Sequence, residues 1–511
     1  MFLILILLGI LVLYYYSVKN FSYFSKRNIK HDPPIPIFGN YLSVAFARFT
    51  DIEMATYLYN KYDSEKVVGY YRGTTPELVV RDPELLKHIL NLDFLHFYKR
   101  GLGRDPKVEP LLRNLVSSEG DTWKLLRKGL SPAFTSSKLK NMFPIINECT
   151  DRMVNLARKM ALTEEEFDAC NLSARFTMEL IGAYGFGIDM NTINNEHSLF
   201  IHLREFIFIK SKWQIFLFAI KDLFPNSLIK KVVLGKPQIA QTLTEILNGI
   251  RKQRQNDTNP RHDFIHLLLE LEKEGKIYSD SLEPDENGQF RKIELDFDDT
   301  YVIAQLYVYL AAGFETASTA MSYTMHELAF HPEIQREVQE EVDRVLDKYD
   351  NKLCSEAVSE MVLLEMCVKE GLRIFPPAGA LFRVCTKNFR IPESNVTIEA
   401  GTKLIVPVQG LHMDPKYFEN PKEFRPKRFL TEAKTWPKYA FIPFGEGPKK
   451  CIGARMGTIE AMCGLAALLH KFNIEPSPSS TKDLKVNRAS FIVQCIENGL
   501  PMQLSFRNKP V

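Results

Sequence analysis

The chain lacks the cysteine patterns that mark disulfide-rich or zinc-binding proteins. Its eight cysteines are scattered over 511 residues, with no CxxC pair and no dense cluster. This distribution disfavours a disulfide scaffold or a structural zinc site. It fits reduced thiols in a domain that faces the cytosol.

A strong net charge and internal repetition are also missing. The formal net charge is only +3, so composition gives no case for nucleic-acid binding. We find no internal repeat and no long low-complexity tract. Apolar residues make up 45% of the chain and charged residues 25%, which describes an ordinary globular protein. The length allows one large domain or several smaller ones.

One long hydrophobic run does occur, at the N-terminus. Residues 1–18 contain no charged side chain, and Tyr14, Tyr15 and Tyr16 precede Lys19. The run is about the minimum length that crosses a bilayer. The tyrosines suit a membrane interface, and the basic residues that follow place the downstream chain in the cytosol. Because no basic segment precedes the run and no small-residue cleavage site ends it, a retained anchor is favoured over a cleaved signal peptide.

The segment after this run is basic and rich in proline. Pro33, Pro34 and Pro36 exclude helix and predict a stiff, extended linker. We therefore expect an anchor at 1–18, a linker at 19–40 and a catalytic domain at 41–511.

Hydrophobic periodicity predicts a mainly α protein with a smaller β-rich lobe. Residues 96–118 and 274–293 are interpreted as irregular or polar loops. The expected helices cover 137–160, 172–188, 296–330, 332–346, 355–374 and 454–472, and the expected strands cover 67–72, 77–80, 384–390 and 396–406.

The stretch Phe441–Gly453, FIPFGEGPKKCIG, suggests a site for a metal. Cys451 follows a glycine-containing loop and precedes a long helical pattern. A thiolate here lies near a helix N-terminus, where free backbone amides favour negative charge. A lone cysteine is usually buried and inert. The full spacing, with Phe444, Gly445 and Gly453 around Cys451, argues against that reading here.

This spacing resembles the cysteine-ligand loop of the cytochrome P-450 family, the haem-thiolate monooxygenases. The resemblance implies the family's fold and makes Cys451 the axial ligand of a haem b iron. Phe444, Gly445 and Gly453 would shape the loop around it. Other motifs in the family's order extend the resemblance from Pro33 to the C-terminus, and details such as LSPAF and AAGFET look most like insect microsomal members.

Further residues match the family's propionate-binding positions. Trp123 and Arg127 lie four apart, on one helical face. They match the family's Trp-x-x-x-Arg, and Arg383 falls where members place a second arginine. Lys449 departs from the pattern, since most members have Arg or His two residues before the cysteine. We expect Lys449 to contact a propionate with less geometric control than an arginine fork would give.

The expected helix at 296–330 carries Ala312, Gly313, Glu315 and Thr316 near its middle. They match the family's oxygen-activation site. There Ala312 and Gly313 would let haem and dioxygen approach the backbone, while Thr316 and Glu315 would deliver protons. On the residues alone, a kinked helix with a satisfied threonine explains the segment equally well.

Glu370 and Arg373 are helical neighbours just before two prolines. They resemble the family's Glu-x-x-Arg, a buried structural pair whose third partner would be Arg428. Lys427 stands where members usually have Glu, a change that we expect to be tolerated.

The resemblance implies a monooxygenase of the endoplasmic reticulum membrane, with its catalytic domain in the cytosol. It would insert one oxygen atom from O2 into apolar small molecules, either xenobiotics or endogenous lipids. Electrons would come from NADPH through a flavoprotein reductase, with cytochrome b5 as a second candidate partner; no nucleic-acid partner is expected. We expect the reductase to dock on Lys124, Lys128, Lys449 and Lys450.

Aromatic residues between 198 and 233 suggest, in part, an apolar surface that dips into the membrane. They are Phe200, Phe206, Phe208, Trp213, Phe216, Phe218 and Phe224.

Two alternatives stay open at this point. A haem-thiolate isomerase or dehydratase would share the cysteine loop but need no reductase, and a haem sensor or carrier would need no turnover. The sequence does not name the substrate.

Overall fold

A computed structural model of the chain describes residues 2–102, 106–196, 198–224, 231–233, 235, 237–255, 263–490 and 493–507. Within the described helices, the side chains at 199, 205, 206 and 237 are not described.

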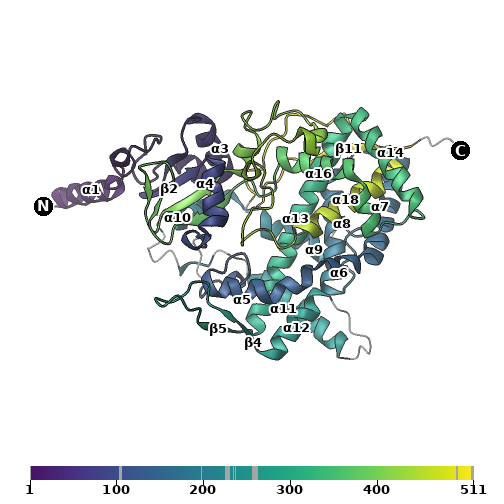
Figure 1. Cartoon of the computed structure of the whole chain (residues 1–511), viewed down its shortest axis with the longest axis horizontal. Helices are drawn as coiled ribbons and strands as arrows, with labels where there is room; N and C mark the ends of the chain where they lie inside the picture. The colour runs from purple at the N-terminus through teal and green to yellow at the C-terminus, as the bar shows by residue number, and fades with distance from the viewer. Residues whose placement is uncertain are drawn as a thin grey trace.

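A helical lobe makes up most of the body. Its central element is α13, a 32-residue helix over Asp299–Phe330. The Asp298 side chain accepts from the Tyr301 amide and starts the helix. Helices α8, α16 and α18 pack against α13 (Figure 1), so apolar residues can occur all round it. The other long helices are α5 Gly120–Leu130, α7 Phe143–Thr163, α8 Ala169–Leu180, α9 Leu199–Phe208, α10 Lys212–Leu223, α11 Pro237–Arg254, α12 Phe264–Glu274, α14 Pro332–Lys348, α16 Val362–Ile374 and α18 Ala454–Lys471.

A smaller lobe is built on a four-stranded sheet in the order β1-β2-β9-β6. Its strands are β1 Val67–Arg72, β2 Thr75–Val80, β6 Leu381–Val384 and β9 Lys403–Val406, with α3 Asp51–Lys61 beside β2. Strands β1 and β2 are antiparallel, with Val67 opposite Val80. The smaller sheets are β10 Phe472–Pro476, β11 Pro501–Phe506 and β3 Phe167–Asp168; β4 Lys276–Asp280 and β5 Lys292–Asp296; and β7 Phe389–Arg390 and β8 Thr397–Ile398. The short helices are α2 Leu42–Ala45, α4 Pro83–Lys87, α6 Ser136–Lys140, α15 Ser355–Glu360 and α17 Val408–His412.

The predicted mainly α class with a small β lobe is therefore confirmed, and the strand over 67–72 has the predicted bounds. The prediction of one helix over 355–374 is wrong, since α15 ends at Glu360 and α16 begins at Val362. Met361 adopts a non-helical conformation between them, and the Glu341 carboxylate accepts from the amides of Leu363 and Leu364 at the new helix start. The predicted long strands over 384–390 and 396–406 are broken into short ones.

The prediction of a polar loop over 274–293 is also wrong. Strands β4 and β5 form a hairpin that lies along α5. Buried Ile277 of β4 packs closely on α5 at Gly129. A Cβ at Gly129 would lie only 3.0 Å from the Ile277 side chain. Lys124 Nζ donates to the Ser281 carbonyl at 2.9 Å, and Lys128 Nζ donates to the Tyr278 carbonyl at 2.7 Å. The helix thus holds the β4 side of the hairpin, which has little hydrophobic pattern of its own.

The segment that precedes the catalytic body is packed onto β1. Phe24 is fully buried against Tyr71, with ring centroids 4.7 Å apart. Gly39 has a φ of 60°, and a Cβ there would lie 2.4 Å from the Gly73 carbonyl oxygen. The expected linker is therefore part of the fold from Phe24 onward.

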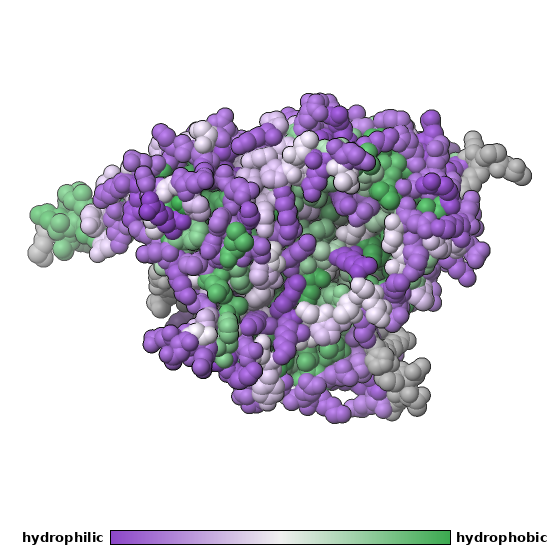
Figure 2. Space-filling view, in the orientation of Figure 1, coloured by the Kyte–Doolittle hydropathy of each residue, from purple (hydrophilic) through white to green (hydrophobic). Residues whose placement is uncertain are grey.

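Helix α1, Phe2–Val18, projects from the β-rich end of the molecule (Figure 1), and its hydrophobic side chains are exposed (Figure 2). Among the described residues, no helix has both the length and the apolar character needed to cross a bilayer.

Candidate active site

The cysteine loop is shaped by two glycines in the left-handed region. Gly445 and Gly447 have φ values of 67° and 76°. A Cβ on Gly447 would stand 1.7 Å from the Leu90 carbonyl oxygen, so no larger residue fits. The Cys451 amide donates to the Phe444 carbonyl at 2.9 Å, and α18 begins three residues later. The loop thus places Cys451 beside a helix start, as the sequence indicates.

Cys451 is the exposed cysteine among the eight, although protein surrounds it. Burial raises the pKa of its thiol, whereas the Gly453 amide and the cations of Arg127 and Arg100 lower it. The thiol is thus accessible although it is largely desolvated. The surrounding amide and cations suit a thiolate that is stabilised once a metal replaces the proton.

Helix α13 also carries accessible surface near its middle. Ala312 is exposed in mid-helix although Phe314 and Glu315 are buried. One turn later the Thr316 hydroxyl donates to the Ala312 carbonyl at 2.7 Å. The helix therefore presents a small residue and a hydroxyl on one open face.

In the structure, the absence of a side chain at Gly313 serves helix packing, whereas the prediction was that it lets haem and dioxygen approach. A Cβ at Gly313 would lie 2.3 Å from Cδ1 of Ile181, which follows α8. The missing side chain thus allows close packing between α13 and its neighbour. Its role toward a cofactor stays a prediction.

Glu315 points away from the open face and is 1% exposed. Its carboxylate accepts from Arg204 Nε at 2.7 Å and from Nη2 at 3.1 Å, a forked pair that joins α13 to α9. Cys495 Sγ donates to the same carboxylate at 3.5 Å. In this geometry Glu315 holds α9 on α13.

Four basic residues gather around the cysteine loop. Arg127 Nη1 donates to the Lys450 carbonyl at 3.0 Å, and burial lowers the pKa of Arg127 while Cys451 raises it. Burial and the charge of Arg100 lower the pKa of Arg383 to about 9 and that of Lys449 to about 7. Burial likewise lowers the pKa of Arg100 to about 10. These positive charges lie together in a desolvated site with too little negative charge to balance them.

Two buried donors nearby are unsatisfied. Trp123 Nε1 and Arg383 Nε have no hydrogen-bond partner among the described residues. The Lys449 ammonium lies 4.9 Å from the centre of the Trp123 ring. Because buried polar groups are normally bonded, these donors indicate a missing acceptor. Haem carries two propionate carboxylates, so the donor set and the excess positive charge fit that group. Arg100, Arg127, Arg383, Lys449 and Trp123 would hold it.

Arg100 and Glu119 were not predicted from the sequence. Arg100 Nη1 donates to the Val116 carbonyl at 2.9 Å, and Nη2 approaches the Lys449 carbonyl at 3.4 Å. The Glu119 carboxylate binds Lys449 Nζ at 3.0 Å. No sequence motif includes either residue, because their contacts join loops that are far apart in the sequence.

The predicted structural residues come together. Glu370 and Arg373 are fully buried, and Arg373 Nε donates to the Glu370 carboxylate at 2.8 Å. Arg428 Nε donates to the same carboxylate at 2.9 Å. Lys427 points outward and pairs with Glu337 at 2.7 Å, so a lysine is accommodated there.

Lys449 is misplaced in the predicted reductase surface. It is only 5% exposed, so a partner protein cannot reach it. Lys124 and Lys128 are bonded to the β4–β5 hairpin. Lys450 remains exposed, beside a cavity of about 490 Å³ that Phe441, Phe444 and Met462 also line.

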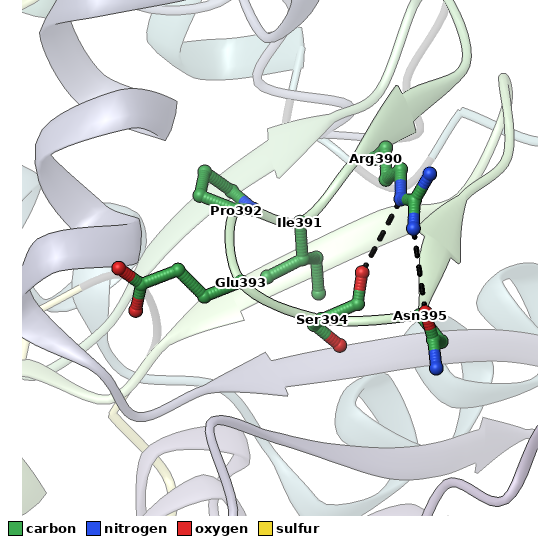
Figure 3. Close-up of a pocket in the computed structure, with 6 residues that line it drawn as sticks. All are labelled: Arg390, Ile391, Pro392, Glu393, Ser394 and Asn395. Carbon is green, nitrogen blue, oxygen red and sulfur yellow. Dashed lines mark hydrogen bonds between the residues drawn. The ribbon is translucent and has the colours of Figure 1, made fainter.

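Another cavity, of about 460 Å³, lies at the turn between β7 and β8 (Figure 3). Arg390 bonds the Ser394 carbonyl and Asn395 Oδ1 across it. Its lining includes none of the candidate residues, so it is a surface feature of the turn.

Comparison with known proteins decides the family. A family model described as Cytochrome P450 matches residues 30–500. The chain belongs to the cytochrome P450 family. It is 33% identical to Cytochrome P450 6B2 of Helicoverpa armigera over 487 residues, which cover 95% of this chain and 94% of that protein. It is 32% identical to Probable cytochrome P450 6a13 of Drosophila melanogaster, with 98% of each chain covered, and 33% identical to Cytochrome P450 9e2 of Blattella germanica, with 94% and 93% covered.

The resemblance to insect members is thereby confirmed. As a cytochrome P450, the protein is a monooxygenase, and the family implies a haem-thiolate centre, a redox partner and a small-molecule substrate.

Proposed function

We propose that this cytochrome P450 oxidises apolar small molecules, including plant toxins and insecticides, with electrons from NADPH delivered by a flavoprotein reductase. The observation that carries the proposal is the arrangement of Cys451 and the α13 face. Cys451 is accessible at a helix start, and α13 carries the exposed Ala312 one turn before Thr316. Haem bound at Cys451 would supply the oxygen-activation chemistry.

The chain's own residues would perform three tasks. Cys451 would bind the iron as a thiolate. Arg100, Arg127, Arg383 and Lys449 would orient the propionates. Thr316 would hold a proton near the reacting oxygen, because its hydroxyl keeps two acceptor lone pairs while it donates to Ala312.

Reconstitution tests the proposal. The full-length protein, combined with an NADPH-dependent reductase, would be offered terpenoids, furanocoumarins, insecticides and fatty acids. Substrate-dependent NADPH use with an oxygenated product supports the proposed activity. Turnover without NADPH would instead favour an isomerase or dehydratase, and binding without turnover a carrier.

We expect Thr316→Ala to uncouple the enzyme. The variant should fold and keep haem, but the product formed per NADPH consumed should fall at least about ten-fold because the hydroxyl that holds the proton there is lost. Paired assays of NADPH, peroxide and product measure this. Thr324→Ala is the matched control, since Thr324 makes the same 2.7 Å bond to the carbonyl four residues earlier, two turns further along α13. Unchanged coupling in Thr316→Ala would remove Thr316 from the mechanism.

We also propose that the protein is held at the endoplasmic reticulum membrane with its catalytic domain in the cytosol. Helix α1 offers exposed apolar side chains. Trp213 is 66% exposed and stacks on Phe216, which contacts the 55% exposed Phe46. Helix α10 and Phe46, which directly follows α2, thus form an apolar surface suited to a membrane. Phe208, by contrast, is buried against Phe314, and the Phe206 side chain lies outside the described part of the chain.

The reductase is proposed to dock near Lys450, on the outer side of the cysteine loop. We expect Lys450→Glu to slow reduction of the iron by about five-fold at low ionic strength, and less in high salt because salt screens exposed charges. Stopped-flow formation of the carbon-monoxide complex measures the rate. Lys252→Glu, an exposed change on α11, is the control. Equal rates for both variants at low salt would contradict the proposal.

A further inference from the structure

The lysine on the cysteine loop is held in an unusual way. Lys449 is buried, and its ammonium lies 3.0 Å from Glu119 Oε2 and 4.9 Å from the centre of the Trp123 ring. A lysine stem is flexible and carries a point charge without the planar fork of arginine. A buried ammonium with no partner is costly, so this side chain stays inside only while a carboxylate holds it.

Glu119 does more than neutralise the lysine. It stands just before α5, and its other oxygen, Oε1, accepts from the amides of Arg100 at 2.7 Å and Gly101 at 3.1 Å. The guanidinium of Arg100 approaches the Lys449 carbonyl in turn. One carboxylate therefore joins three segments that are far apart in the sequence: residues 100–101, the start of α5 and the cysteine loop.

The placement of this carboxylate needs an explanation, because it stands where two propionates are expected. A negative charge repels propionates, and Arg100, Arg127, Arg383 and Lys449 would attract them more strongly without it. The advantage of having Glu119 at this place must therefore lie in geometry and not in charge. Glu119 fixes the one cation of the four whose side chain cannot orient a carboxylate by its own shape.

We propose that Glu119 is a positioning residue for the cofactor: it holds Lys449 on the face of Trp123 and fastens the Arg100 segment to the cysteine loop, so that both cations meet the propionates. This inference rests on haem being bound at Cys451. The chain thereby keeps a working lysine at a position that arginine usually fills.

The test follows haem release from the purified holoenzyme to apomyoglobin. Glu119→Gln keeps the size of the side chain and an oxygen for the two amides, but presents no anion to Lys449. We expect haem to leave about ten-fold faster, as loss of a charge-assisted hydrogen bond implies. Asp82→Asn is the control, because Asp82 also bonds an amide at a helix start, that of Leu85 in α4, and is not bonded to Lys449.

Two further measurements separate this role from a purely structural one. With haem dimethyl ester, which has no propionate charges, Glu119→Gln and the unchanged protein should release the cofactor at similar rates. In the Lys449→Arg background, Glu119→Gln should accelerate haem release much less, because a guanidinium keeps its own donor geometry.

An equal effect with both forms of haem, or no effect with either, overturns the proposal. If Glu119→Gln yields no folded protein even beside Lys449→Arg, the carboxylate serves the fold and the proposal also fails. The red-shifted carbon-monoxide band of the unchanged protein reports separately whether haem is bound by thiolate at all.

Discussion

Replacing Cys451 with alanine is expected to abolish the red-shifted Soret band of the reduced carbon-monoxide complex and all monooxygenase activity. That band reports a thiolate on the iron, and Cys451 is the exposed cysteine among the eight. Burial raises the pKa of the free thiol, so iron binding must release its proton. The Gly453 amide and the charges of Arg127 and Arg100 lower the pKa and stabilise the resulting anion. Alanine offers no donor at all.

Spectra of the purified variants measure this outcome. Cys354→Ala is the control, since Cys354 is half-buried at the start of α15 and its sulfur accepts from the Ala357 amide. That variant should keep the full band. Cys451→His should restore haem content but not the red shift, because imidazole replaces the thiolate. If Cys451→Ala retains the band, another ligand holds the iron and the assignment is wrong.

The parts of the site that could be predicted depend on local geometry. Trp123 and Arg127 lie on one face of α5 because helical spacing alone puts them there. The glycines of the cysteine loop have positive φ, which is what their occurrence in a tight loop indicates. Both inferences need only neighbours in the sequence.

The residues that escaped prediction depend on contacts between distant segments. Glu119 meets Lys449 across 330 positions, and no pattern in either segment encodes the pairing. The burial of Lys449 follows from the same contact, which is why a lysine expected on a docking surface lies inside. The β4–β5 hairpin escaped prediction for a related reason. Strand β4 has little alternation of its own and packs on α5, and only β5 alternates polar and apolar residues.

The linker shows how composition can mislead. Three prolines indicate an extended chain, and the chain is indeed non-helical there. Yet the Gly69 amide donates to the Lys30 carbonyl and the Asn40 amide to the Tyr71 carbonyl, so the segment is fastened to β1. Extended backbone leaves its amides and carbonyls free to pair with a sheet, and the sequence alone does not show whether a sheet is nearby.

The second large effect is expected at Glu370. Its carboxylate accepts two bonds from Arg373, at 2.8 and 2.9 Å, one from Arg428 at 2.9 Å and one from the Arg425 amide at 2.9 Å. Arg373 is fully buried, and its Nη1 also donates to the His412 carbonyl. Helix α16 is thereby joined to the segment that leads to the cysteine loop.

Glu370→Ala should destabilise the protein by about 3–5 kcal/mol, because two guanidinium groups are left without a counter-charge in a desolvated core. That loss is a large share of the roughly 5–15 kcal/mol that separates folded from unfolded protein. Little folded, haem-containing protein should accumulate on expression, and any that does should unfold at much lower urea concentration.

Helix α16 supplies its own control. Glu365 and Lys369 form an ion pair 3.0 Å apart on the same helix, but their side chains are 41% and 38% exposed. Such a surface pair contributes about 1 kcal/mol or less to stability, so Glu365→Ala should unfold at nearly the same urea concentration as the unchanged protein. The two variants remove the same side chain from one helix and differ chiefly in burial. If the free energies of unfolding of Glu370→Ala and Glu365→Ala differ by less than about 1 kcal/mol, the penalty for uncompensated buried charge is missing. The buried cluster then does not hold α16 in place.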